Sequence, residues 1–166
     1  MCLSPTHSSF ENYIKEIQNI IDSNKPYFLN YSSTSNKPKM VVFDIDDTLL
    51  STVGMNDSCF VTFPRIKPVV EFYYFLKKLG YRIVLITARQ QTVDSITKKN
   101  LISEGIVGYD DLFSRSMMDN FIPIGLYKMN KRKYLSDKYD IVGNIGDQTT
   151  DFYGGYNGKS IKLPNF

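Results

Sequence analysis

Three aspartates stand close together at the end of an apolar segment. The sequence MVVFDIDDTLL, residues 40–50, carries Asp44, Asp46 and Asp47 with apolar residues on both sides. Burying an unpaired carboxylate is unfavourable, and neighbouring carboxylates also repel one another. A divalent cation such as Mg²⁺, which prefers oxygen ligands, would remove both costs. The pattern therefore indicates a metal site.

Further polar residues follow two later apolar segments. Thr87 ends the segment YRIVLIT, and Asp147 ends the segment DIVGNIG, with Asp151 shortly after it. A carboxylate beside Mg²⁺ can attack phosphorus, and a second carboxylate can protonate the leaving oxygen and later deprotonate water. A threonine hydroxyl, the amides that follow it (Ala88) and a lysine can hold the phosphoryl oxygens. These residue types favour metal-assisted phosphoryl chemistry.

The segments that must position these residues alternate between strand and helix patterns. Strand patterns cover residues 40–45, 81–87, 111–116, 140–146 and 159–164, and helix patterns cover residues 68–80, 89–105 and 128–138. Apolar strands joined by helices are typical of a parallel sheet covered on both faces, in which ligands bind beyond the carboxyl ends of the strands. We therefore expect an α/β fold, a Rossmann-like three-layer sandwich with a mostly parallel sheet and helices on both faces.

A further helix is predicted before the first strand. Apolar residues recur at helical spacing over residues 8–21, and the polar segment 23–39, which Pro26 interrupts, is predicted to be a connector. We therefore assign residues 1–39 to an N-terminal helix and polar connector. Residues 40–166 are assigned to the catalytic domain, within a single globular domain overall.

Composition and charge are ordinary for a soluble globular protein. The chain of 166 residues has a formal net charge of +3 with scattered Lys and Arg, so nucleic acid is not an expected partner. Its two cysteines, Cys2 and Cys59, fit a reducing compartment rather than a disulfide framework. No segment has the pattern of a signal peptide or a membrane span. We expect a cytoplasmic protein without membrane contact, for which a homo-oligomer remains open.

The motifs resemble those of the haloacid dehalogenase-like (HAD) phosphatases. DIDDTLL resembles their first motif, DxDxT; VLITAR resembles the second; and GDQTTD resembles the fourth, GDxxxD, in the same order. The segments FDIDDTLLS, LGYRIVLITAR, GNIGDQTTDF and KSIKLPN are similar to the acid phosphatase class B group (subfamily IIIB), which includes bacterial acid phosphatases and plant vegetative storage proteins. The resemblance covers roughly residues 40–163.

The resemblance implies a role for each matching residue. It implies that Asp44 is the nucleophile, that Asp46 is the general acid and base, and that Thr87 binds phosphate. It also implies a Mg²⁺ cofactor, held by Asp44, the main-chain carbonyl of Asp46 and Asp147, with Asp151 as a second-shell or water-mediated residue. Three motifs in order carry this inference.

The lysine of the third motif is less clearly marked in the sequence. KMNK, residues 128–131, resembles a K-x-x-K pattern in which the second lysine reaches the phosphate. We therefore expect Lys131 to bind phosphate, with Lys128 as the alternative, and expect the other cations of this helix to be solvated. Arg89 fits either a substrate contact or an ion pair at a helix start, and Asp47 fits a role in fixing its loop.

These observations predict a Mg²⁺-dependent phosphomonoester hydrolase that acts through an aspartyl-phosphate at Asp44. One alternative is a phospho-accepting regulatory domain, which would not carry a GDxxxD motif near the C-terminus. Another is a non-catalytic storage or interaction protein, against which the presence of Asp44 counts. Nucleoside monophosphates, sugar phosphates, phosphoproteins and polynucleotide ends all remain open as substrates.

The segments between the motifs are too short for an independent cap domain. Only residues 51–67 separate the first motif from the next helix, and about one helix and one strand separate the second motif from the lysines. We therefore expect a minimal cap and an open site, edged by the loop 52–64.

Overall fold

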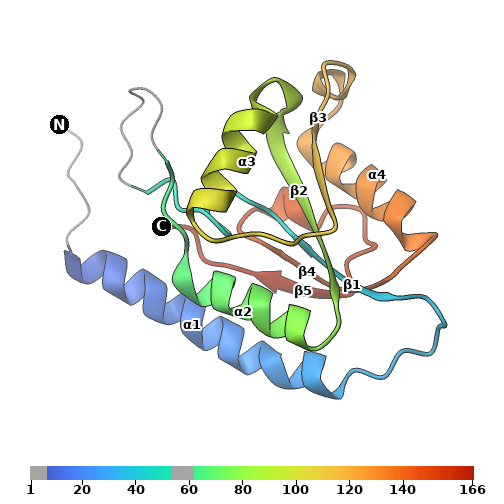
Figure 1. Ribbon diagram of the computed structural model, residues 1–166, viewed down its shortest axis with the longest axis horizontal. Coiled ribbons are helices and arrows are strands. Elements are labelled where there is room, and N and C mark those ends of the chain that lie inside the picture. The colour runs from blue at the N-terminus through green and yellow to red at the C-terminus, as the bar shows by residue number, and fades with distance from the viewer. Residues whose placement is uncertain (1–6, 54–61) are drawn as a thin grey trace.

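A computed structural model describes residues 7–53 and 62–166 of the chain, as a single sheet with helices packed on it (Figure 1). The strands are β1 (Lys39–Phe43), β2 (Arg82–Gln90), β3 (Asp111–Arg115), β4 (Asp140–Gly146) and β5 (Lys159–Lys162). The helices are α1 (His7–Asn30), α2 (Lys67–Lys78), α3 (Asp94–Ser103) and α4 (Ile124–Ser136). Short 3₁₀ segments are η1 (Gln91–Val93), η2 (Met118–Phe121) and η3 (Thr149–Asp151).

The sheet is parallel and has β1 at its centre. The strand order is β3-β2-β1-β4-β5, and each neighbouring pair is parallel. The chain leaves β1 toward β2 and β3, and later returns to the other side of β1 as β4. A ligand site in such a sheet is expected where the strand order reverses, beyond the carboxyl ends of the strands. Here that position lies between β1 and β4.

Helices cover both faces of the sheet and make three layers. Side chains alternate along β1, so that Val41 and Phe43 belong to one hydrophobic cluster and Met40 and Val42 to another. The first cluster also contains buried residues of α1, α2 and α3, whereas the second contains Tyr127 and Leu135 of α4. The predicted three-layer α/β fold is confirmed. Within residues 7–53 and 62–166, no helix is both long and apolar enough to cross a membrane.

Helix α1 is longer than predicted. It continues through Pro26 to Asn30, where the sequence had indicated a connector. Proline removes one helical hydrogen bond, but the packing of Phe28 favours continuation. Phe28 is buried, its carbonyl accepts a 2.8 Å hydrogen bond from the Tyr81 hydroxyl, and its ring lies where a side chain on Gly143 would stand. Tertiary contacts therefore outweigh the local signal.

Two other boundaries differ from the sequence prediction. Strand β2 runs to Gln90, beyond the predicted start of a helix at residue 89, because Gln90 still pairs with Arg115 of β3. Helix α4 begins at Ile124, earlier than the predicted 128, directly after Pro123. The earlier start adds one turn, which includes the buried residue Tyr127.

The described segments beside the site contain no folded cap. Between β2 and α4 the chain forms only η1, α3, β3 and η2. Of these, β3 is a strand of the sheet and α3 packs on one of its faces. Residues 54–61, part of the loop that the sequence predicts at the edge of the site, lie outside the described residues. Between β2 and α4 the described chain agrees with the expected minimal cap.

Candidate active site

Asp44 is the first residue after β1 and lies at the carboxyl edge of the sheet. Its backbone N–H donates a 3.0 Å hydrogen bond to the carbonyl of Ile145 in β4, which fixes the strand end beside β4. Its side chain is buried, with the residue 7% exposed. The chain then turns back, because the amides of Leu49 and Leu50 both donate to the carbonyl of Ile45 at 2.9 Å. The turn holds Asp44 in place at the centre of the edge.

Asp47 fixes this turn, as expected from the sequence. Its φ of 52° lies in the left-handed region, which aspartate tolerates better than most residues. Both of its carboxylate oxygens accept hydrogen bonds from Thr52, one from the amide and one from the hydroxyl, each at 2.7 Å. Asp47 therefore stabilises the turn between Asp44 and Thr52.

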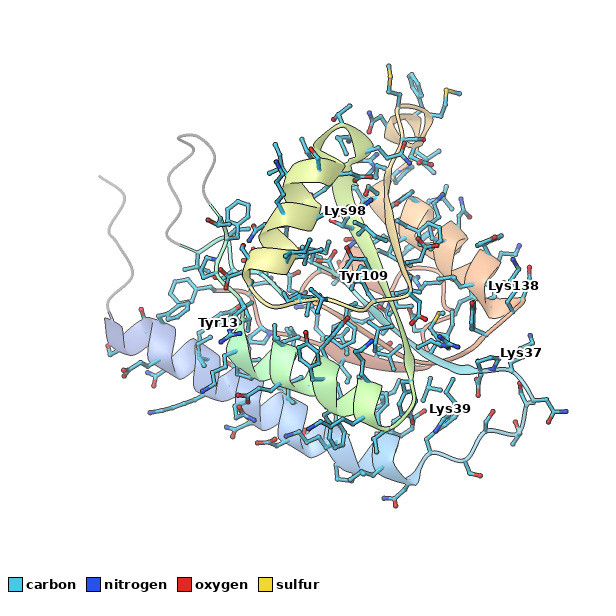
Figure 2. The ribbon with its side chains drawn as sticks, viewed as in Figure 1. Tyr13, Lys37, Lys39, Lys98, Tyr109 and Lys138 are labelled. Atoms are coloured by element: carbon cyan, nitrogen blue, oxygen red, sulfur yellow. The ribbon has the colours of Figure 1, made fainter. Side chains whose placement is uncertain are left out.

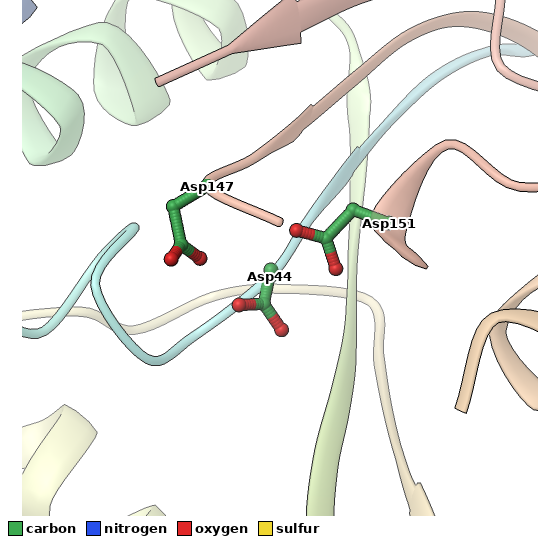
Figure 3. Close-up of side chains that lie close together, drawn as sticks. All are labelled: Asp44, Asp147 and Asp151. Atoms are coloured by element: carbon green, nitrogen blue, oxygen red, sulfur yellow. The ribbon is translucent and has the colours of Figure 1, made fainter. Parts of the chain in front are cut away.

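Three buried carboxylates meet at this edge of the sheet (Figure 3). Asp44 follows β1, Asp147 follows β4, and Asp151 ends η3. One oxygen of each lies within 4.8 Å of the others. The three residues are 7%, 3% and 2% exposed, so water cannot screen their mutual repulsion. The structure thus brings Asp44 together with Asp147 and Asp151, which lie about a hundred residues later in the sequence.

The position of Asp151 depends on a close approach to Gly146. A Cβ atom on Gly146 would stand 2.1 Å from an Asp151 carboxylate oxygen, so only glycine leaves room for that carboxylate. The Gln148 amide donates to Asp151 Oδ2 at 2.9 Å, and the Asp151 carbonyl accepts bonds from Arg132 and Asn144 at 2.7 Å. The GDQTTD segment is thus shaped to aim Asp151 into the cluster.

Arg132 is a structural residue that the sequence analysis placed on a solvated helix face. It is 1% exposed, and its guanidinium donates to the carbonyls of Asp151, Tyr153 and Gly155. Burial lowers the pKa of Arg132 to about 10, against the opposing effect of Asp151. Its spacing from Lys128 and Leu135, which are also buried, was the sequence signal for a buried stripe on α4.

Lys128, not Lys131, contacts the carboxylates. Lys128 Nζ lies 2.6 Å from Asp44 Oδ1 and 2.5 Å from Asp151 Oδ1, and the residue is 4% exposed. Lys131 instead places its Nζ over the rings of Phe113 and Tyr127, 5.7 and 5.4 Å from their centroids. Residues three apart on a helix are offset by about 60° around its axis. This offset, together with the packing of α4, gives the two lysines different partners. The structure therefore favours the alternative, Lys128, as the lysine of the site.

The electrostatics of the cluster favour binding of positive charge. Burial, opposed by Lys128 and reinforced by Asp151 and Asp46, raises the pKa of Asp44 to about 7. Burial also raises the pKa of Asp147, although its 2.5 Å hydrogen bond from Gln148 acts in the opposite direction. Burial alone would lower the pKa of Lys128, but Asp44 and Asp151 outweigh burial and raise it. The lysine stays charged, while the carboxylates are under-compensated.

Asp46 is held by Arg89 at the mouth of the site. Arg89 Nη2 lies 2.6 Å from Asp46 Oδ1, and Arg89 Nε lies 2.9 Å from Asp46 Oδ2. The guanidinium also donates to the Thr97 hydroxyl at 3.2 Å and stacks over Phe63. Of the two roles that the sequence left open for Arg89, the structure shows an ion pair, but with Asp46 rather than with a residue of the following helix.

The remaining predicted residues line or support one pocket. The pocket has a volume of about 170 Å³ and includes the three residues Asp44, Asp46 and Asp147 together with Ala88 and Lys128. Thr87 lies within β2 and is fully buried, and its hydroxyl oxygen accepts a 3.1 Å hydrogen bond from the Arg89 amide. That oxygen still carries a proton to donate.

A divalent metal ion fits the donor set of this pocket. Among the described residues, the three buried carboxylates contact one ammonium group, that of Lys128, so the cluster carries excess negative charge. Carboxylate oxygens are the ligands that Mg²⁺ prefers, and Mg²⁺ usually keeps several waters when one or two carboxylates bind it. The chemistry of the residues present is therefore compatible with a hydrated hard cation.

The fold and this carboxylate cluster fit the HAD superfamily. The sequence model for HAD superfamily, subfamily IIIB (acid phosphatase), matches residues 61–166, and the chain belongs to this family. Asp44 and Asp46 lie before the matched range, so their assignment depends on the geometry described above.

The chain is also similar to curated plant proteins and to a bacterial structure. It is 28% identical over 172 residues to acid phosphatase 1 of Solanum lycopersicum, covering 92% of this chain and 68% of that protein. It is 29% identical over 143 residues to vegetative storage protein 1 of Arabidopsis thaliana, covering 75% and 53%. The crystal structure of a class C acid phosphatase from Bacillus anthracis with tungstate bound matches with a TM-score of 0.75 at 18% identity, covering 96% and 79%. The chain thus spans about half to two thirds of the length of these curated relatives.

Proposed function

We propose that the protein hydrolyses phosphomonoesters in a Mg²⁺-dependent reaction with Asp44 as the nucleophile. The observation that carries this proposal is the buried cluster of Asp44, Asp147 and Asp151, contacted by Lys128 at the carboxyl edge of a parallel sheet. A metal ion bound to Asp44, Asp147 and the Asp46 carbonyl would neutralise the phosphoryl group and hold it in line with Asp44.

In the first step, a carboxylate oxygen of Asp44 forms a bond to phosphorus. The bond between phosphorus and the leaving oxygen breaks, and Asp46 gives its proton to that oxygen. The product is an aspartyl-phosphate at Asp44 and a free alcohol. Lys128, together with the Thr87 hydroxyl and the Ala88 amide, donates hydrogen bonds to the phosphoryl oxygens as their charge increases.

In the second step, water replaces Asp44 on phosphorus. Asp46, now a carboxylate, removes a proton from the water, and the attack releases phosphate and restores Asp44. Arg89 supports this step because it orients the ionised carboxylate of Asp46 toward the pocket. Asp151 acts indirectly, since its two carboxylate oxygens already accept bonds from Lys128 and from the Gln148 amide.

The open edge of the site favours broad specificity among small phosphomonoesters, including nucleotides and sugar phosphates. With no folded cap among the described residues, the leaving group has few contacts through which binding energy could act. We infer that residues 1–39 and 40–166 work as one domain, because α1 contributes to the same hydrophobic cluster as β1 and β2. The cytoplasmic location stays a prediction from cysteine usage; Cys2 and Cys59 lie outside the described residues.

A panel of phosphomonoesters tests this function directly. Purified protein should release phosphate from several members of the panel in Mg²⁺, and an Asp44→Asn variant should release none. The contrasting candidate is a non-catalytic protein, favoured by the similarity to a vegetative storage protein. Wild-type protein that binds Mg²⁺ yet is as inactive as Asp44→Asn on the whole panel would support that candidate.

A further inference from the structure

Tyr13 of α1 carries a buried hydroxyl that has no hydrogen-bond partner. The residue is 5% exposed, and among residues 7–53 and 62–166 no donor or acceptor lies within hydrogen-bonding distance of its hydroxyl oxygen. An unpaired buried hydroxyl is unfavourable, and buried polar groups in native proteins are usually paired with protein atoms, an ordered water or an ion. Figure 2 shows Tyr13 on the part of α1 that packs against the rest of the fold. We therefore expect the Tyr13 hydroxyl to have a hydrogen-bond partner in solution.

The side chain of Tyr13 lies beside the carboxylate edge of the sheet. Its ring meets Phe166 edge-on, with the centroids 5.2 Å apart. The neighbouring residue Asn165 lies 3.5 Å from Gln148 Nε2, and the same Gln148 group donates to Asp147 Oδ2 at 2.5 Å. A short chain of contacts thus joins Tyr13 to Asp147.

Two carboxylates of this edge also act electrostatically on Tyr13. Burial, followed by Asp47 and then Asp147, raises the pKa of Tyr13 to about 12. The hydroxyl is therefore protonated at neutral pH and remains a hydrogen-bond donor. Both oxygens of Asp47 accept a hydrogen bond from Thr52, whereas only one oxygen of Asp147 accepts a side-chain hydrogen bond, from Gln148, among the described residues.

We propose that the Tyr13 hydroxyl donates a hydrogen bond to the water shell of the metal ion held by Asp44 and Asp147. The inference rests on the proposed metal-dependent function and extends it, because it makes α1 a wall of the metal site. Groups that orient metal ligands and bound water from outside commonly change metal affinity by about 10- to 100-fold when they are removed. Tyr13 is thus a positioning residue that touches neither substrate nor phosphorus.

Tyr127 provides a matched control within the same chain. It is fully buried on α4, on the opposite face of the sheet, and its hydroxyl also has no partner among the described residues. The carboxylates that act on it are Asp119 and Asp94, which are not part of the metal cluster. Replacing either tyrosine by phenylalanine removes one buried unpaired hydroxyl and keeps the ring.

The experiment compares metal binding by wild type, Tyr13→Phe and Tyr127→Phe. Calorimetric titration with Mg²⁺ and with Mn²⁺ should show about 10-fold weaker binding for Tyr13→Phe and wild-type binding for Tyr127→Phe. In EDTA, both variants should melt at or above the wild-type temperature, since each has lost an unsatisfied group. Added Mg²⁺ should then raise the melting temperature of Tyr13→Phe less than that of the other two proteins.

Each contrary result is informative. Equal Mg²⁺ affinity in wild type and Tyr13→Phe overturns the inference and leaves the proposed function standing. A Tyr13→Phe variant that melts well below wild type in EDTA shows that the hydroxyl supports the fold itself, which also overturns the inference. Wild-type protein that binds neither Mg²⁺ nor Mn²⁺ overturns both the inference and the metal-dependent function.

Discussion

Lys128 Nζ and Asp44 Oδ1 lie 2.6 Å apart, although the two residues are 84 positions apart in the chain. The contact forms because α4 leads into β4, and β4 pairs with β1, which ends at Asp44. Both side chains are almost fully buried, so the charge of each depends on the other. The first prediction follows from this dependence.

Replacing Lys128 by methionine should abolish most of the activity. The change removes the ammonium group that contacts Asp44 and Asp151, and we expect kcat/KM to fall by about 100-fold or more, as for the loss of a preorganised donor to a transition state. Lys131→Met is the matched control, because Lys131 lies over two aromatic rings instead. Its activity should stay within a factor of about three of wild type. Steady-state kinetics on one substrate decides between them, and a larger loss for Lys131→Met would contradict the assignment of Lys128.

Removing divalent metal should abolish activity and lower stability together. In EDTA the three buried carboxylates keep Lys128 as their only cationic partner among the described residues, whereas a bound metal ion stabilises the folded state by mass action. Saturating Mg²⁺ at about 100 times its Kd should add about 2.7 kcal/mol to the free energy of unfolding. Asp147→Asn should lose most of this increment and Asp151→Asn less of it. Urea denaturation with and without Mg²⁺ measures both, and full activity in EDTA would exclude the metal role.

The Arg89–Asp46 ion pair predicts a leaving-group effect. Arg89→Met should leave Asp46 poorly oriented, and proton transfer by a positioned group contributes about 100-fold or more to rate. The loss in kcat should therefore be larger for an alkyl phosphate, whose leaving oxygen needs a proton, than for p-nitrophenyl phosphate, whose leaving group departs as an anion. An equal loss on both substrates would indicate that Arg89 acts on phosphate binding instead.

The raised pKa of Asp44 predicts how stability changes with pH in EDTA. The folded pKa of about 7 exceeds the ordinary value of 3.8, so the folded protein binds this proton more tightly than the unfolded chain does. The resulting stabilisation is complete below about pH 4 and is lost as pH rises through about 7. Asn at position 44 stays neutral, so Asp44→Asn should become more stable than wild type by an amount that grows between pH 5 and pH 8, of the order of 1 kcal/mol or more. A difference that is constant over this range would contradict the raised pKa.

Much of the fold could be predicted because strand and turn signals agree with the packing. The strand predicted at residues 140–146 is β4 as observed, since its apolar residues, bounded by turns, fit a buried parallel strand. Helix α1 could not be bounded in the same way. Pro26 is a strong local signal for an end, and only contacts with distant residues, such as Tyr81 with Phe28, show why the helix continues.

In the candidate site, too, some residues could be predicted from local sequence patterns and others depend on contacts between distant residues. Asp44, Asp147 and Asp151 could be placed together because strand ends share one edge of a parallel sheet. The choice between Lys128 and Lys131 depends on how α4 is rotated against the sheet. The two lysines lie only about 60° apart around the axis of α4, so tertiary packing decides between them. The pairing of Arg89 with Asp46 joins the end of β2 to the turn after β1, and no spacing in the sequence encodes it.

The most direct test of the account is whether a phosphoryl group becomes attached to Asp44 during turnover. Wild-type protein turning over a phosphomonoester in Mg²⁺ would be quenched rapidly in acid, digested and analysed by mass spectrometry, with borohydride reduction to mark the acyl-phosphate. We predict one phosphoryl group on the peptide that contains Asp44, at Asp44 itself, and none in the Asp44→Asn variant. Active enzyme whose quenched samples carry no phosphorylated residue, or carry it at another side chain, would contradict the account.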